Sequence, residues 1–233
     1  MCASLRRPRA ALEIAASLSQ ALKKEALAVK VDGEVQGLTT VIDRDCALEF
    51  LTFADEEGRR VYRHTASHVM AQAVKALWPE AKLAIGPAIE NGFYYDFDCD
   101  TAFSTEDFKK IEKEMERIVK ANYPIVRSEK PRDAAIAYMQ EKGEPYKVEL
   151  IEDLPEDAVI SFYTQGDFTD LCAGPHLPST GYVKAVKIMS VAGAYWRGSE
   201  KNKMLQRLYA TAFPKKADLD AYVQQLEEAK KRD

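Results

Sequence analysis

The sequence has few of the residues that mark a secreted, fibrous or membrane-spanning protein. Its four cysteines, Cys2, Cys46, Cys99 and Cys172, are widely spaced and form no CxxC pair. A chain of this length with that spacing has no disulfide framework, which favours a reducing cytoplasm. Only 11 glycines and 10 prolines occur in 233 residues, which excludes collagen-like and low-complexity chains. No stretch approaches about 18 uncharged apolar residues, so we expect no membrane-spanning helix.

The charge balance excludes a second class of protein. The chain has 33 basic and 37 acidic residues, a formal net charge of -4. This argues against a uniformly basic nucleic-acid binder, although a local basic groove is compatible with it. Arginines near the start are not followed by the apolar run of a secretion signal, because Glu13 interrupts it. The hydrophobic content of 46% is that of a globular protein.

The first part of the chain has the pattern of a small α+β unit. Apolar residues over 11–18 have helical spacing, and residues 26–38 suggest a hairpin around Asp32-Gly33. Cys46 to Phe53 alternates apolar and polar residues, as a half-buried strand does. The polar run 54–60 is interpreted as a linker. We therefore expect one module over residues 1–55 and a second domain over 56–233.

The second domain combines helices and strands. A helix is predicted from Tyr62 to Leu77, because Trp78-Pro79 disfavours its continuation. Ser104 or Thr105 caps a long amphipathic helix, and another helix spans 132–142. Predicted strands are two within 83–97 and one each at 146–151, 160–165, 184–196 and 204–211, and a helix begins at Ala217.

The chain contains only three histidines, and their spacing carries the chemical argument. His64 and His68 are four residues apart, so they lie on one face of the predicted helix. His176 follows Cys172 by four residues, and the Gly174-Pro175 step between them excludes a helix and indicates a loop. All three histidines thus occur in pairs that would present side chains to one point.

Three chemistries suit a His/His/Cys/His set. These are a tetrahedral zinc site, Cys/His nucleophilic catalysis, and metal-free activation of water by histidine. Zinc-protease chemistry is disfavoured, because Thr65 stands where the HExxH motif has its glutamate. No GxxxxGK[ST] loop and no GxGxxG after a strand is present, which argues against nucleotide binding.

Several segments resemble the editing domain of bacterial-type threonyl-tRNA synthetases. They are Arg63–His68, Ile85–Pro87, Asn91–Asp96, Gly143–Lys147, Asp170–His176 and Ala192–Gly198. The His/Cys pairs alone would also fit the related alanyl-tRNA editing domain, and Ala192–Gly198 favours the threonyl family. Residues 1–55 resemble the ubiquitin-like TGS module that precedes editing. The resemblance implies an α+β fold. A partial β-grasp module, with its first hairpin missing, precedes an editing domain that has a mainly antiparallel sheet, packed helices and the start of a linker helix.

The resemblance implies hydrolysis of serine from mischarged tRNA(Thr). Serine and threonine differ by one methyl group, which is worth only ~1–3 kcal/mol in a binding pocket, so a second, hydrolytic site is needed. The catalytic residues implied are His64, Lys147, Asp170 and His176. The substrate-binding residues implied are Tyr95, His68 and Cys172, whereas Tyr94 faces the other side of the same strand.

The resemblance also sets expectations for cofactors and partners. Editing in this family requires no cofactor, and a zinc ion, if bound, would use His64, His68, Cys172 and His176. The expected partner is the acceptor end of tRNA(Thr) carrying serine. The family continues into a catalytic domain that binds ATP and zinc and forms a homodimer, so we expect a cytoplasmic synthetase fragment. The alternatives are a freestanding trans-editing factor, a zinc-dependent alanyl-type editing protein and a non-catalytic RNA-binding module.

Overall fold

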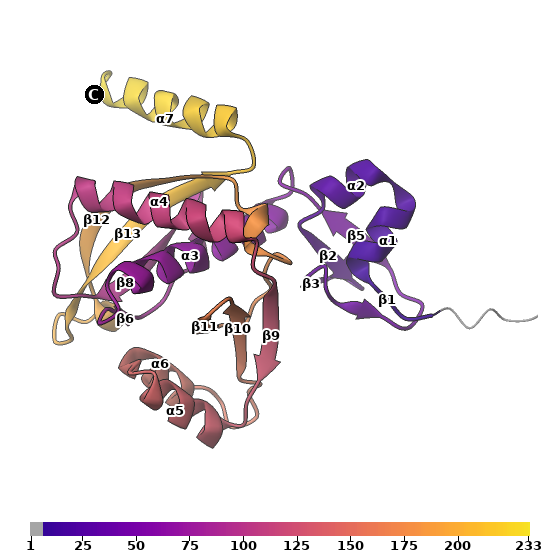
Figure 1. The fold of residues 1–233 in the computed structure, drawn as a ribbon, viewed down its shortest axis with the longest axis horizontal. Helices are drawn as coiled ribbons and strands as arrows, with labels where there is room; N and C mark the ends of the chain where they lie inside the picture. The colour runs from indigo at the N-terminus through magenta and orange to yellow at the C-terminus, as the bar shows by residue number, and fades with distance from the viewer. Residues whose placement is uncertain (1–6) are drawn as a thin grey trace, which may run out of the picture. The chain divides into compact units, whose positions relative to one another are not determined.

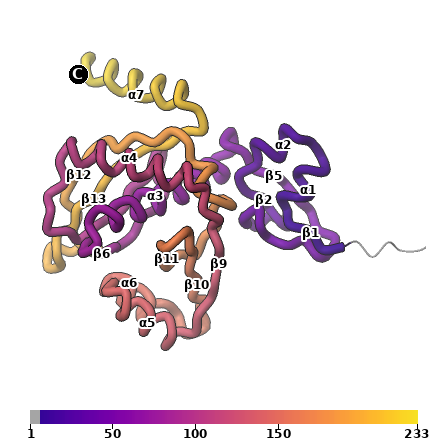
Figure 2. Tube along the Cα trace, in the orientation of Figure 1, coloured from indigo at the N-terminus to yellow at the C-terminus, as the bar shows by residue number. Residues whose placement is uncertain are grey.

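The computed structural model describes residues 7–233 (Figure 1). By its contacts the chain divides into two compact units. The first comprises residues up to 62 together with 174–178, and the second comprises 63–173 together with 179–233. Figure 2 shows the course of the chain through each unit. The expected absence of a first hairpin concerns Met1 to Arg9, of which Met1 to Arg6 lie outside the described residues.

The first unit is a small α+β module. Its elements are β1 (Arg9–Ala10), α1 (Ala11–Leu18), α2 (Gln20–Glu25), β2 (Ala28–Val31), β3 (Glu34–Gln36), β4 (Val41–Ile42) and β5 (Leu48–Leu51). Strand β2 lies between β3 and β5, and β1 pairs with β4. The predicted hairpin is confirmed, because Asp32 and Gly33 have φ of 49° and 85°. Positive φ at both central residues is the requirement of a tight hairpin turn.

The predicted linker over 54–60 is wrong, because helix α3 (Glu56–Leu77) begins inside it. Acidic residues Glu56 and Glu57 occupy the first turn, where they interact favourably with the helix dipole. The Asp55 carboxylate accepts a hydrogen bond from the Thr52 backbone N–H at 2.8 Å. Gly58 is required for close approach, because a Cβ there would overlap the Thr52 carbonyl. The polar composition therefore belongs to the exposed first turns of a helix.

We expect Gly58→Ala to destabilise the chain by about 1–3 kcal/mol, because the new methyl group would push α3 away from Thr52. Urea denaturation measures the free energy of unfolding. Arg60→Ala is the matched control, because its side chain is exposed and its pairing with Glu56 spans 3.8 Å at the surface. Equal stability of Gly58→Ala and the parent chain would contradict a stabilising role for the close approach of Gly58 to Thr52.

The second unit contains two antiparallel sheets. The larger has the order β12-β13-β8-β6, with β7 also paired to β8, and the smaller has the order β11-β10-β9. The strands are β6 (Lys82–Leu83), β7 (Ala88–Ile89), β8 (Gly92–Asp98), β9 (Ile125–Glu129), β10 (Ser161–Gln165), β11 (Phe168–Leu171), β12 (Ala185–Tyr195) and β13 (Met204–Phe213). The long strands predicted at 184–196 and 204–211 are confirmed as β12 and β13.

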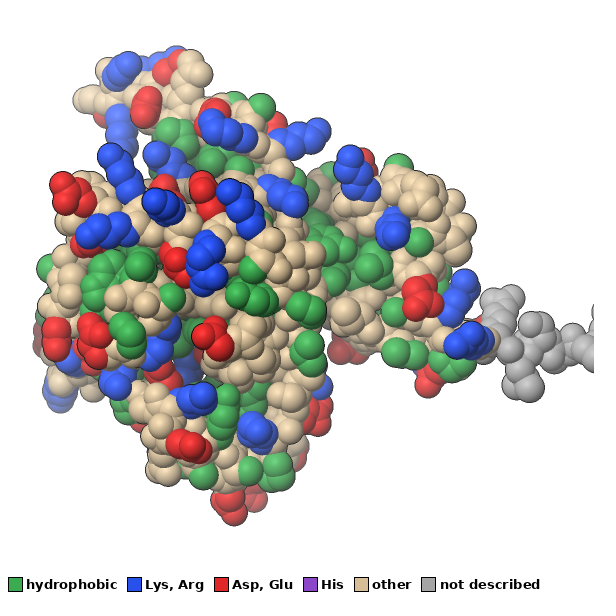
Figure 3. Space-filling view, in the orientation of Figure 1, with side chains coloured by type: hydrophobic (Ala, Val, Ile, Leu, Met, Phe, Trp, Pro, Cys, Tyr) green, Lys and Arg blue, Asp and Glu red, His purple; other side chains and the backbone are tan. Residues whose placement is uncertain are grey.

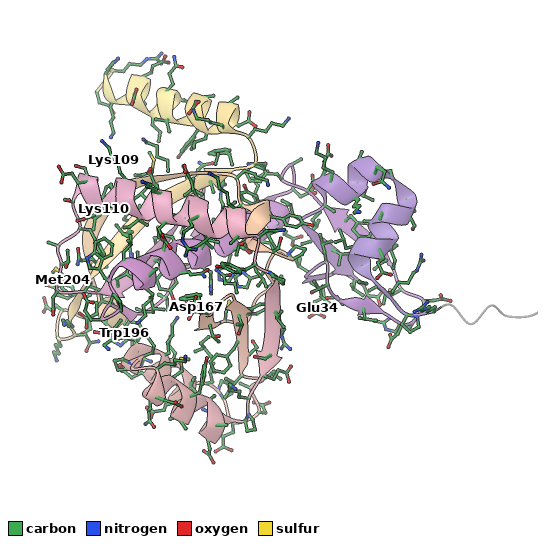
Figure 4. All side chains as sticks on the ribbon, viewed as in Figure 1. Glu34, Lys109, Lys110, Asp167, Trp196 and Met204 are labelled. Atoms are coloured by element: carbon green, nitrogen blue, oxygen red, sulfur yellow. The ribbon has the colours of Figure 1, made fainter. Side chains whose placement is uncertain are left out.

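Helices pack against these sheets. Besides α3 they are α4 (Thr105–Ala121), α5 (Arg132–Glu141), α6 (Pro145–Glu152) and α7 (Lys216–Lys230), with short 3-10 turns η1 (Thr180–Tyr182) and η2 (Trp196–Gly198). Ser104 begins α4 with a capping box to Asp107, as its sequence predicts. The buried side chains of α4 are Phe108, Ile111, Met115 and Ile118. Lysine and arginine side chains, interspersed with acidic ones, cover the outer face of α4 (Figure 3). Lys109 and Lys110 project there (Figure 4).

The strand predicted at 146–151 is wrong, because these residues form helix α6. Pro145 occupies the first helical turn, where its fixed φ and missing N–H are favourable. A six-residue run of mixed apolar and polar residues is compatible with either element, so the proline and the packing against α5 decide it. Residues 83–97 form parts of three strands rather than two, and β9 and β11 were not predicted.

No helix within residues 7–233 is long and apolar enough to cross a membrane. The domain boundary predicted at 55/56 stays a prediction.

Candidate active site

Helix α3 presents His64 and His68 on one face. Their rings lie edge to face, with centroids 5.0 Å apart. His68 is buried, whereas His64 is partly exposed. Between them Ser67 donates to the His64 carbonyl and lies 2.7 Å from the Gly86 carbonyl as well. This hydroxyl fixes the helix turn against the segment that precedes β7.

Asp170, in β11, is the centre of the site. It is 1% exposed, and its Oδ2 accepts a hydrogen bond from the Tyr95 hydroxyl at 2.6 Å. The same oxygen lies 3.4 Å from His68 Nδ1. Its Oδ1 lies 2.9 Å from Lys147 Nζ, yet accepts no aligned hydrogen bond within residues 7–233. Asp170 therefore has an ion pair on one oxygen and capacity there to accept a further hydrogen bond.

Lys147 reaches this carboxylate from the first turn of α6. Its side chain is 4% exposed, and Nζ donates to the Tyr95 hydroxyl at 3.0 Å as well as contacting Asp170. A buried lysine is expensive unless it is paired and hydrogen-bonded, and here both conditions hold. The site thus contains a buried ion pair bridged by a phenol.

Tyr94 and Tyr95 lie on opposite faces of β8, as a strand requires. Tyr95 is fully buried and contacts Asp170, whereas the Tyr94 ring stacks under the Arg207 guanidinium at 4.0 Å. Gly86 packs on the Tyr95 ring so closely that a Cβ would overlap it. Glycine at this position is therefore required by the placement of Tyr95.

Cys172 and His176 lie in the predicted loop, which follows β11. Cys172 Sγ lies 3.5 Å from His64 Nε2. Ser161 in β10 fixes the Cys172 backbone, since its hydroxyl donates to the Cys172 carbonyl at 2.5 Å and its carbonyl accepts from the Cys172 N–H at 3.1 Å. One ligand atom from each of His64, His68, Cys172 and His176 lies within 4.8 Å of the others. These nitrogen and sulfur atoms are of the types that hold a tetrahedral zinc ion.

Burial controls the protonation of the two helix α3 histidines. Desolvation lowers the pKa of His64 to about 4, although the charge of Asp170 opposes this shift. Desolvation also lowers the pKa of His68 well below its usual value, with His64 and Lys147 adding to the effect. The His64 ring therefore titrates well below the range of an ordinary imidazole. Both rings are neutral at pH 7 and each has a lone pair that can accept a proton.

Residues to which the sequence analysis assigned no role lie around the site. Gln72 on α3 donates to the Gln165 carbonyl at 3.2 Å, and Gln165 Nε2 donates to Gln72 Oε1 at 2.8 Å. Glu144 and Lys75 form a largely buried ion pair close to α6. Nothing in the local sequence pattern marks these partners, because they are far apart in the chain.

Two segments of the chain match known protein families. Residues 160–209 match the threonyl and alanyl tRNA synthetase second additional domain, and residues 3–52 match the TGS domain. The first match includes Asp170, Cys172 and His176. The chain has the TGS and editing domains of threonyl-tRNA synthetases.

Threonyl-tRNA synthetases of several bacteria are similar to nearly the whole chain. The threonine–tRNA ligase of Clostridium acetobutylicum is 65% identical over 221 residues, and that of Acetivibrio thermocellus is 64% identical over 221. The Syntrophomonas wolfei ligase is 63% identical over 222 residues. Each alignment covers 95% of this chain and 35% of the relative, so the chain spans about a third of the length of these curated relatives.

We expect Gly86→Ala to lower the free energy of unfolding by about 1–3 kcal/mol, because its methyl group would displace the Tyr95 ring. Urea denaturation tests this. Glu90→Ala, at an exposed position of the same segment, should stay within about 0.5 kcal/mol of the parent chain. If both variants are equally stable, the close packing on Tyr95 has no energetic weight.

The low pKa of His64 predicts a pH dependence of stability. The unfolded ring binds a proton near pH 6.5 and the folded ring only near pH 4, so the unfolded state binds more protons between these values. This contribution to stability is complete above about pH 6.5 and declines as the pH falls toward 4. Histidine ring NMR signals, assigned with His64→Gln, should show no His64 titration between pH 6 and 8. A midpoint near 6.5 would contradict the prediction.

Proposed function

We propose that the chain hydrolyses the ester bond of seryl-tRNA(Thr). The observation that carries the proposal is the buried Lys147–Asp170–Tyr95 network beside the neutral His64 ring. These groups combine a proton acceptor, a fixed positive charge and a carboxylate with accepting capacity. The similarity to threonyl-tRNA synthetases supports an aminoacyl-tRNA as the substrate.

The reaction divides among these residues as follows. A water oxygen attacks the ester carbonyl carbon, and the His64 imidazole takes the proton that the water loses. The Lys147 ammonium stabilises the negative charge that develops on the carbonyl oxygen. The bond to the ribose oxygen then breaks, and that oxygen receives the proton from His64. The products are serine and tRNA with a free 3′ end.

The remaining residues bind and orient the substrate. Asp170 Oδ1 accepts a hydrogen bond from the seryl ammonium or hydroxyl, while Tyr95 and His68 hold the carboxylate in place. Cys172 and His176 contact the seryl group and the terminal adenosine. A pocket of this kind rejects threonine through its extra methyl group. We further propose that the reaction needs no metal, and that zinc, if present, would be held by the four His and Cys ligands.

The tRNA partner and the cellular location are also part of the proposal. The partner is the acceptor end of tRNA(Thr), and phosphate contacts dominate such binding, so a chain of net charge -4 should bind tRNA weakly at physiological salt. Threonine ligation and dimerisation are attributed to whole synthetases. A cytoplasmic location remains our prediction.

Deacylation assays test the activity directly. We expect release of serine from seryl-tRNA(Thr) to be much faster than release of threonine from threonyl-tRNA(Thr). His64→Ala should lower the rate by about 10²–10⁴-fold, the range for loss of a general base. Lys142→Met, at an exposed lysine before α6, is the matched control. Equal rates on both esters would contradict the specificity. Faster hydrolysis of alanyl-tRNA(Ala) would favour the alanyl-type alternative.

Metal removal tests the catalytic role of the His/Cys group. After dialysis against a chelator we expect an unchanged deacylation rate and an unchanged urea midpoint, because the proposed steps use side chains and water alone. Elemental analysis before and after dialysis confirms that any metal has been removed. If the rate falls after dialysis and added zinc restores it, the metal rather than His64 activates the water.

A further inference from the structure

Glu144 is a buried carboxylate that the proposed chemistry does not use. It is 5% exposed and immediately precedes α6. Its Oε2 accepts a hydrogen bond from the Leu83 backbone N–H at 2.8 Å, and its Oε1 lies 3.0 Å from Lys75 Nζ. The side chain therefore joins the beginning of α6 to strand β6 and to helix α3.

Lys75 is itself held in place by other contacts. Its ammonium donates to the Pro79 carbonyl at 3.0 Å and to the Ala81 carbonyl at 2.8 Å. On α3 it follows His68 by seven residues and so lies on the same face of the helix as His64 and His68. The partner of Glu144 is thus fixed to the helix that carries both histidines.

Glu144 and Lys147 are separated by less than one turn of α6. The Val148 N–H donates to the Glu144 carbonyl at 3.2 Å, so Glu144 is the N-cap residue of α6. From that start Lys147 Nζ reaches Asp170 Oδ1 at 2.9 Å and the Tyr95 hydroxyl at 3.0 Å. Any shift of the start of α6 would therefore change the distances from Lys147 Nζ to Asp170 and to Tyr95.

The groups around Glu144 act on its carboxylate in opposite directions. Burial raises the pKa of Glu144, and the charge of Asp170 adds to this, whereas the Leu83 N–H and Lys75 oppose it. Two carboxylates, Glu144 and Asp170, are matched by two ammonium groups, Lys75 and Lys147. Loss of one carboxylate leaves Lys75 with its two carbonyl acceptors and no counter-charge.

We propose that Glu144 is a positioning residue, which fixes the start of α6 against α3 and β6 and so holds Lys147 at Asp170 and Tyr95. The inference rests on the proposed function in giving Lys147 a role at the ester. Misplacement of a catalytic group by about 1 Å can cost as much as 100-fold in rate. Glu144 acts through Lys147 and does not touch substrate.

The first test separates turnover from binding. Glu144→Gln keeps an oxygen for the Leu83 N–H and loses the charge that pairs with Lys75. We expect kcat for seryl-tRNA(Thr) to fall at least about 10-fold while KM changes less than about 3-fold, since the seryl contacts at Asp170 remain. Glu149→Gln, on the exposed side of α6, should change neither. An unchanged kcat in Glu144→Gln would overturn the proposal.

A double-mutant comparison tests whether Glu144 affects the rate through Lys147. In a Lys147→Met background, adding Glu144→Gln should lower the remaining rate by less than 2-fold, because the group that Glu144 positions is gone. If Glu144→Gln lowers the deacylation rate by the same factor in the Lys147→Met background as in the parent chain, Glu144 does not act through Lys147. That result would overturn the inference.

A third measurement does not depend on activity. The ammonium ¹⁵N–¹H NMR signal of Lys147, assigned with Lys147→Met, should be protected from rapid exchange by its buried contacts. Glu144→Gln should shift this signal and speed its exchange several-fold, and Lys75→Met should act in the same direction if Glu144→Gln fails to fold. An unchanged signal in a folded variant would overturn the positioning role. If the parent chain shows a protected signal and no deacylation, the proposed function fails and the positioning role stands.

Discussion

The burial of one carboxylate constrains the rest of the second unit. Asp170 is almost inaccessible to water, and an ionised carboxylate in such a place is stable only when it is paired and hydrogen-bonded. Lys147 supplies the charge and Tyr95 the hydrogen bond, and these two residues come from a helix and from a strand of the other sheet. Removal of either partner would leave the other side of the pair unsatisfied in a dry environment. The pairing therefore joins β11, α6 and β8 more strictly than apolar packing alone would.

Burial also accounts for the neutral histidines. Desolvation disfavours positive charge on both rings, and the Lys147 ammonium beside them adds to this effect. A neutral imidazole with a low pKa holds a proton only weakly. Such a ring suits a step in which the proton is received and released again within one reaction.

The sequence predicted most of the elements that depend on interactions between residues close together in the chain. The hairpin at Asp32-Gly33, the capping box at Ser104 and the i, i+4 spacing of His64 and His68 depend only on near neighbours. The errors at 54–60 and 146–151 arose where tertiary contacts decide, as with Gly58 against Thr52. The family motifs indicated that Lys147, Asp170 and Tyr95 belong together, and the structure brings them into contact. The roles of Gly86 and Glu144 could not be predicted, because each depends on a partner from another part of the chain.

The pairing of Gln72 and Gln165 has a consequence for how this sequence can change over time. The Gln165 side-chain amide donates to the Gln72 side-chain oxygen, the Gln72 amide donates to the Gln165 backbone carbonyl, and both side chains are buried. A substitution at position 165 leaves the Gln72 oxygen without this donor, and one at position 72 leaves the Gln165 amide without this acceptor, each at a cost of about 1–3 kcal/mol. The two positions are therefore expected to vary together across relatives. They would do so although 93 residues separate them and neither touches a reacting atom.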